Sequence, residues 1–207
     1  AMGPSVSDPR SGEIIESDII WYHNHLRSYR NRFLIETAAS NPKARTLETS
    51  EEDIGEMMEM VISHEVGHAL GFPHNMGASS SYEVENYRKA DFTQKEGISA
   101  SIMDYARFNY IAQPEDKGVR YIRQMGPYDD YAVNWGYRLL PDAKTPEDEV
   151  PTLNKWVEAK AGDARFRFGN QGTTFDPSSQ TEDIGNDPVR ASTYAVKNLK
   201  YVAKNLA

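Results

Sequence analysis

The stretch His64-Glu65-Val66-Gly67-His68-Ala69-Leu70-Gly71-Phe72-Pro73-His74 decides how this chain folds. Residues four apart lie on one face of a helix, so His64 and His68 can present imidazole nitrogens to one metal ion. Glu65 lies between them and is offset, so it can hold and deprotonate a water molecule without taking a coordination position. The stretch therefore predicts a zinc site on a helix with a general base beside it.

The third zinc ligand is expected beyond the end of this helix. Gly71 supplies the left-handed residue that ends a helix, and Pro73 keeps the residue before it extended, so His74 can return to the metal. Three protein ligands and one open position make a catalytic zinc site. A glutamate from a later segment, Glu83 or Glu85, is the alternative third ligand, but Gly71 and His74 make it unnecessary.

The pattern H-E-x-x-H-x-x-G-x-x-H resembles the signature of the metzincin zinc metallopeptidases. The downstream stretch Ser101-Ile102-Met103-Asp104-Tyr105 resembles their Met-turn. This resemblance implies that Met103 lies beneath the metal as an apolar floor. It also implies that Tyr105 is an electrophilic helper that contacts the zinc or the tetrahedral intermediate. Asp104 stands where the astacin branch carries a histidine.

Several segments resemble one family more narrowly. They are Asp8 to Ile14, the zinc stretch, Ser101 to Pro114, Gly126 to Tyr137 and Gln180 to Asp183. Together they are similar to the Met-zincin catalytic domain of large exported zinc-dependent metalloproteases of Bacteroides-type bacteria. The resemblance implies an extracytoplasmic protein, in the periplasm, at the cell surface or secreted, and further domains in a longer parent chain. It supplies neither a substrate nor a role for the outer segments.

Length and composition set the remaining bounds. The 207 residues suffice for one substantial core, and we expect a metzincin-like catalytic domain over residues 1–140 with a linker and helical extension over 141–207. The net charge of −8 argues against nucleic acid as a partner. No apolar stretch approaches the roughly 18 residues that span a bilayer. There is no cysteine, so thiolates cannot hold the metal and imidazoles are the expected ligands. We also expect the protein to be a monomer.

The patterning predicts an α+β, predominantly helical chain: a metzincin-like zincin domain with a zinc helix, a Met-turn and a C-terminal helix. A strand is expected at 13–18, and helices at 19–39, from Ser50 through the zinc stretch, and at 127–136, 153–161 and 188–207. Metzincins normally place several strands before the zinc helix. Only 63 residues precede His64, so we expect a reduced or truncated N-terminal sheet.

Two segments near the expected cleft have open interpretations. In the metzincins an edge strand binds substrate backbone, because an exposed edge lets an extended peptide add as another strand. The strand at 13–18 is either that edge or an ordinary hairpin strand. Phe108, Tyr110 and Ile111 are either the outer wall of the specificity pocket, as the resemblance implies, or core residues.

Three polar features remain. The helix at 127–136 resembles the C-terminal helix of the serralysin and matrixin branches, which makes Asp129 or Asp130 the acid that hydrogen-bonds beneath the zinc site. Residues 77–100 are expected to form a surface loop with one short helix, and its acidic side chains are either solvated or bind calcium. His23 and His25 point to different helix faces, so they are surface or packing residues rather than a second metal site.

These features predict a zinc-dependent endopeptidase that hydrolyses a protein or peptide substrate. His64, His68 and His74 hold Zn²⁺, Glu65 takes the proton of the attacking water, and Tyr105 hydrogen-bonds the oxyanion. The alternative from another class is a zinc-bearing module that binds peptides or glycoproteins without hydrolysing them. A third interpretation is a structural zinc site, which would close the fourth position with another protein ligand.

Overall fold

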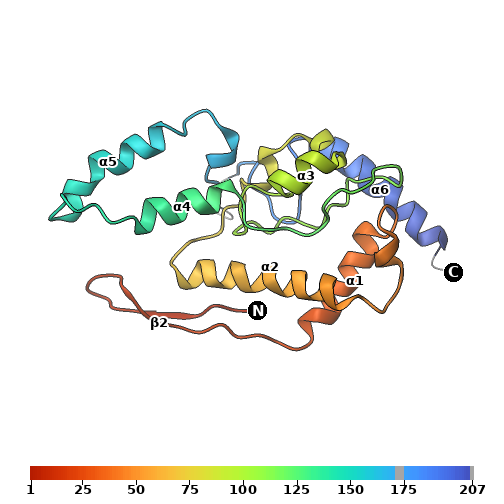
Figure 1. The fold of residues 1–207 in the computed structure, drawn as a ribbon, viewed down its shortest axis with the longest axis horizontal. Helices are drawn as coiled ribbons and strands as arrows, with labels where there is room; N and C mark the ends of the chain where they lie inside the picture. The colour runs from red at the N-terminus through yellow and green to blue at the C-terminus, as the bar shows by residue number, and fades with distance from the viewer. Residues whose placement is uncertain (171–174, 206–207) are drawn as a thin grey trace.

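The computed structural model describes residues 1–170 and 175–205. Its strands are β1 (Ser5–Ser7) and β2 (Ile14–Ser17), and its helices are α1 (His25–Thr37), α2 (Glu51–Ala69), α3 (Ala90–Glu96), α4 (Pro127–Tyr137), α5 (Pro146–Glu158) and α6 (Pro188–Asn205), as Figure 1 shows. Short 3-10 turns are η1 (Pro42–Arg45), η2 (Ser79–Ser81), η3 (Val84–Arg88) and η4 (Ala164–Phe166). The described residues hold one two-stranded sheet. The predicted helix-rich α+β class with a reduced sheet is confirmed.

The sheet is an antiparallel hairpin that runs alongside α2 (Figure 1). Ser5 pairs with Ser17, and an isolated bridge joins Met2 to Ile20. The strand predicted over 13–18 is confirmed as β2. The segment before β1 lies against the zinc helix, because a Cβ built on Gly3 would stand 3.1 Å from Glu65 Oε2. The first residues of the chain are thus next to Glu65, whereas β2 approaches the turn after the helix, where a Cβ on Gly71 would stand 3.5 Å from Ile14 Cδ1.

Helix α2 begins and ends where the sequence predicts. The Ser50 hydroxyl oxygen accepts a hydrogen bond from the Asp53 N–H at 3.1 Å, and acidic residues fill the first turn. At the other end the Gly71 N–H donates to the His68 carbonyl and the Phe72 N–H donates to the Gly67 carbonyl. Gly71 has φ +88°. This pair of bonds with a left-handed glycine is the Schellman arrangement, which turns the chain sharply after the helix.

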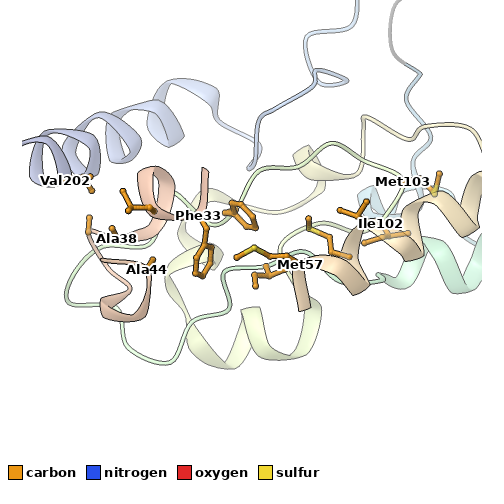
Figure 2. Packing of buried hydrophobic residues seen from close by; sticks show 13 residues of the cluster. Phe33, Ala38, Ala44, Met57, Ile102, Met103 and Val202 are labelled. Atoms are coloured by element: carbon orange, nitrogen blue, oxygen red, sulfur yellow. The ribbon is translucent and has the colours of Figure 1, made fainter. Parts of the chain in front are cut away.

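The core beside the site is built on the buried face of α2. Met57, Met60 and Val61 pack with Phe33 and Leu34 of α1, Ile102 and Met103 of the Met-turn, Phe108, Ile122 and Val202 of α6. Figure 2 shows this cluster running along the helix from Val202 to Met103. Each fully buried side chain of this size contributes about 1.5–3 kcal/mol relative to exposure. The zinc helix is therefore held by a core whose residues come from segments far apart in sequence.

The predicted start of the first helix is wrong. Apolar spacing suggested residue 19, but α1 begins at His25. Ile20 instead exchanges both backbone hydrogen bonds with Met2, at 2.8 and 3.1 Å. Because the backbone of Ile20 is committed to the hairpin, it cannot also form the helical ladder, and pairing with a distant segment overrides local propensity.

The predicted surface position of residues 77–100 is also wrong, although α3 is the one short helix expected there. The segment also contains η2 and η3, and its side chains Tyr82, Tyr87 and Ile98 are at most 3% exposed. They form a second core cluster with Ile111 and Ile184. Short 3-10 turns carry no sustained hydrophobic period, so periodicity does not reveal this core. In the described part of the chain the acidic side chains of 77–100 form no metal-binding group.

The C-terminal third differs in detail from expectation. The stretch assigned to a linker contains the start of α5 at Pro146, where Asp148 Oδ2 accepts from the N–H groups of Lys144 and Thr145 at 3.0 Å. Helix α6 is confirmed through Asn205, and the last two predicted residues lie outside the described part. Asn198 donates from α6 to the carbonyls of Tyr110 and Ala112, both at 2.8 Å. The division at residue 140 stays a prediction.

Candidate metal centre

The structure brings together the three histidines that the sequence singled out. The Nε2 atom of His68 lies 3.1 Å from Nε2 of His64 and 3.1 Å from Nε2 of His74. Among the described residues these three form the one group of His, Asp or Glu side chains able to hold a metal ion, and their ligand atoms all lie within 4.8 Å of one another. The turn at Gly71 therefore returns His74 to the helix as predicted.

The tautomers of two imidazoles are fixed from behind. The Nδ1–H of His64 donates to the Ile102 carbonyl at 2.8 Å, and the Nδ1–H of His68 donates to the Phe72 carbonyl at 2.9 Å. A carbonyl only accepts, so Nδ1 carries the proton and Nε2 keeps its lone pair. Lone pairs facing one another at 3.1 Å repel unless a cation lies between them. The donor set therefore fits Zn²⁺, which binds neutral imidazoles.

Burial favours the neutral form of two of these imidazoles. It lowers the pKa of His64 to about 3, and the nearby positive charge of Arg123 acts in the same direction. The pKa of His74 is lowered by burial and then by repulsion from His68. Neutral imidazole is the form that binds metal, so His64 and His74 are ready to bind a cation at neutral pH.

The Met-turn is anchored by a single carboxylate from α4. Asp129 accepts from the Ser101 hydroxyl at 2.6 Å, from the Ile102 N–H at 2.7 Å and from the Gly126 N–H at 2.7 Å. Asp129 is buried and Asp130 is exposed. Of the two candidates, Asp129 is thus the acid beneath the site, and it acts through Ile102, whose carbonyl holds His64.

Met103 touches the zinc helix α2 at Gly67. A Cβ on Gly67 would stand 2.2 Å from Met103 Sδ, so only glycine admits the methionine here. Met103 is buried in the core cluster of α2. The contact of Met103 with the turn of helix between His64 and His68 is consistent with the floor role that the resemblance implies.

Tyr105 lies over the histidines. Its ring centroid is 4.4 Å from that of His74 and 5.3 Å from that of His64, nearly parallel to the latter. The side chain is 38% exposed. Burial, and then the charge of Glu65, raises the pKa of its phenol, so Tyr105 stays a proton donor at neutral pH.

A cavity of about 230 Å³ opens beside the histidines. Glu65, His64 and Tyr105 line one side of it, and Met60, Val61 and Phe108 form an apolar wall. Phe108 is therefore both a core residue and a wall of this cavity. Ile111 is fully buried in the second core cluster, and Tyr110 packs against that cluster. Glu65 thus borders both the histidines and a space large enough for a substrate side chain.

Sequence reasoning missed the charged residues of this cavity. Arg123 lines it and is only 6% exposed, and its Nη1 donates to the carbonyls of Asp104 and Ala106. Arg107 lines it too and forms ion pairs with Glu36, at 3.1 Å, and with Glu182. These residues come from separate loops and helices, so no local spacing signals them.

A buried asparagine secures the turn after the third histidine. The Asn75 N–H donates to the Met103 carbonyl at 3.0 Å, and its side chain bonds Arg167 and Gly169 of the later chain. Asn75 is not one of the residue types that usually bind zinc, so no ligand pattern in the sequence indicates it. His25, by contrast, packs among Trp21, Tyr22 and Tyr29, which agrees with its predicted packing role.

The histidine-bearing helix, the Schellman turn, the three converging imidazoles and the Met-turn are the features of a metzincin-type domain. Within that class the chain belongs to the Met-zincin family, whose model matches residues 46–207. No match was found among the curated proteins or the solved structures compared. None of the described helices is both long and apolar enough to cross a bilayer. The hairpin and α1 lie outside the family match, and closeness to the Bacteroides-type proteases stays a prediction.

Proposed function

We propose that the protein is a zinc-dependent endopeptidase in which His64, His68 and His74 hold the metal and Glu65 is the general base. The observation that carries the proposal is the set of three Nε2 atoms that face one another, two of them fixed in the metal-binding tautomer. Among the described residues the group has no fourth His, Asp or Glu. Three ligands support a catalytic rather than a structural site.

When bound, Zn²⁺ supplies Lewis acidity, which polarises a carbonyl and makes water easier to deprotonate. Glu65 is buried on the same helix face as the cavity and takes the proton of the attacking water. It then delivers that proton to the amine of the leaving product. The Tyr105 hydroxyl donates to the oxyanion that develops on the scissile carbonyl.

The hairpin offers an edge for substrate backbone. Met2 directs both its N–H and its C=O at Ile20, and Pro4 directs its C=O at Asp18. In an antiparallel ladder the residue between them points its backbone groups the other way, so Gly3 presents its N–H and C=O away from β2. Gly3 lies against Glu65. We therefore assign the substrate-binding edge to residues 2–7 rather than to 13–18.

The test is digestion of a peptide library by the zinc-loaded protein and by a Glu65→Gln variant. The amide has the shape of the carboxylate but cannot accept the proton, so turnover should fall by about 10²–10⁴-fold. Zinc content, measured by elemental analysis, should stay at one per chain. Equal cleavage by both proteins would remove Glu65 as the base, and the absence of chelator-sensitive cleavage would favour the peptide-binding alternative.

A Tyr105→Phe variant tests the helper. The lost hydroxyl should lower kcat by about 10–100-fold while KM stays within a few-fold, because the hydrogen bond is made only in the transition state. Unaltered kinetics would reduce Tyr105 to a packing residue.

We also propose an extracytoplasmic location, supported by the family resemblance. Fractionation of the natural host with an antibody against the chain tests that location.

A further inference from the structure

The cavity beside His64 contains a buried cation that forms no ion pair within the described residues. Arg123 is 6% exposed and takes part in none of the ion pairs within the described residues. Its Nε has no hydrogen-bond partner there. A buried charge is normally paired, because desolvation of an isolated ion costs several kcal/mol. The guanidinium thus calls for an anion, and the cavity is the space from which one can approach.

The nearest acidic groups do not fill this role. Asp129 accepts two hydrogen bonds from the Met-turn and one from Gly126 at the start of α4. Asp104 meets Arg123 through its backbone carbonyl, and burial raises the pKa of its carboxyl to about 7, so much of its charge is suppressed at neutral pH. The charge of Arg123 is therefore directed at the cavity rather than cancelled within the fold.

The second arginine of the cavity, unlike Arg123, already has ionic partners. Arg107 lies between Glu36 and Glu182, and Glu182 adopts φ +70°, the one left-handed residue other than glycine in the described chain. Such a backbone costs of order 1–3 kcal/mol and persists where the surroundings require it. The segment Gln180 to Asp183, which carried no role from its sequence, thus places an acid at the cavity wall. Arg123 and the exposed Arg32 of α1 are the arginines of the cavity that form no ion pair within the described residues.

The shape of the cavity matches one type of side chain. Its volume of about 230 Å³ is below the roughly 300–1,000 Å³ of pockets for drug-sized ligands, so it suits one side chain. Met60, Val61 and Phe108 provide an apolar wall for methylene groups, and Arg123 provides charge. A glutamate combines these two features. Arginine binds a carboxylate with charge-assisted and often bidentate hydrogen bonds, and an amide replaces these poorly.

We propose that this cavity is a specificity pocket for an acidic side chain next to the scissile bond, glutamate above all, with Arg123 as the residue that recognises it. The proposal rests on the proposed endopeptidase function. It adds a substrate class that the metal site alone does not define.

The experiment pairs internally quenched peptides that differ only by Glu or Gln beside the cleaved bond. The zinc-loaded protein should favour the Glu peptide by about 100-fold in kcat/KM, because a pocket built for hydrogen bonds rejects an analogue that lacks them. Arg123→Gln should bring this ratio close to one, and Arg123→Lys should restore part of it. Binding of the uncleaved peptides to the Glu65→Gln protein, followed by calorimetry, should show the same order.

Two further variants keep the test sharp if Arg123 replacements fold poorly. Arg32→Gln removes an exposed cavity cation and should lower the Glu/Gln ratio about threefold. Arg27→Gln removes an exposed arginine of the same helix that does not line the cavity, and should leave the ratio unchanged. Cleavage without preference for Glu would overturn the pocket and leave the endopeptidase standing. Preferential binding of the Glu peptide without any cleavage would support the pocket and overturn the endopeptidase.

Discussion

Asp129 and Arg123 are both buried charged groups beside the same metal centre, but their hydrogen-bonding groups are satisfied to different extents. Asp129 receives three hydrogen bonds of 2.6–2.7 Å from the Met-turn and the start of α4. Arg123 gives its bonds to two carbonyls and keeps an Nε without a partner among the described residues. A fully satisfied buried group stabilises structure, whereas an incompletely satisfied one marks a place for a ligand.

The same contrast separates two sides of the site. The side of the Met-turn holds the histidines in place through Ile102, Met103 and Asp129. The side of the cavity holds charged groups that an outside molecule can reach, Arg123 among them. Asp104 lies in the Met-turn next to Arg123, and its Oδ1 is also unpartnered in the described chain. Changes on the first side should act mainly on stability and metal retention. Changes on the second should act on pH dependence and substrate choice.

The largest effect expected is from Asp129→Ala. It leaves the Ser101 hydroxyl and the N–H groups of Ile102 and Gly126 buried without acceptors, so the free energy of unfolding should fall by about 3–5 kcal/mol. Urea denaturation measures this. Asp130→Ala is the matched control, because it lies in the same first turn of α4 but is exposed, and it should change stability by less than about 0.5 kcal/mol. Equal losses in both variants would contradict the anchoring role.

A smaller effect is expected from two glycines of the zinc helix. In Gly67→Ala the new methyl group meets Met103 Sδ, so Met103 must move, at a cost of about 1–3 kcal/mol, and zinc affinity should fall with it. Gly55→Ala lies in the same helix with no heavy atom within 4 Å. It should stabilise the protein by up to about 1 kcal/mol through helix propensity. Thermal unfolding of both variants would refute the Met103 contact if they shifted in the same direction.

The sequence predicted one side of this comparison far better than the other. His64, His68 and His74 lie within one helix and its cap, so local spacing and the turn chemistry of Gly71 determine where they meet. The family resemblance left Asp129 and Asp130 as the two candidates for the acid beneath the site. Only Asp129 is buried, so it is the residue that fits. Such features depend on short-range geometry, which a sequence displays directly.

The cavity could not be predicted in this way. Arg123 and Glu182 reach it from segments 58 and 117 residues after Glu65. Each lies in irregular chain, where no periodicity indicates which side is buried. The predicted helix start at residue 19 and the predicted surface position of residues 77–100 were wrong for the same reason. Pairing of Ile20 with Met2 and burial of Tyr87 depend on distant partners. Long-range packing, rather than propensity, decides these positions.

The smallest effect tests the surroundings of Arg123 through Asp104, whose backbone carbonyl accepts from the guanidinium. Burial raises the pKa of its carboxyl to about 7, from 3.8 in an exposed carboxyl, so the folded protein holds this proton more tightly than the unfolded chain. The resulting stability is fully present below the unfolded pKa and is lost as the pH rises through about 7. Between pH 6 and pH 8 the protein should therefore lose about 1 kcal/mol of unfolding free energy relative to Asp104→Asn.

In the natural protein the Ser79 N–H donates to Asp104 Oδ2 at 2.6 Å. Asparagine keeps an oxygen that can accept this hydrogen bond, so the variant removes only the charge of the side chain. Asp183→Asn serves as the comparison, because burial raises the pKa of Asp183 to about 6 and its loss of stability should come about one pH unit earlier. Both series need saturating zinc, so that metal release affects all proteins equally. If the curve of Asp104→Asn ran parallel to that of the natural protein from pH 6 to 8, Asp104 would be ionised throughout. It would then be a counter-charge for Arg123, and the contrast between the two sides of the site would weaken.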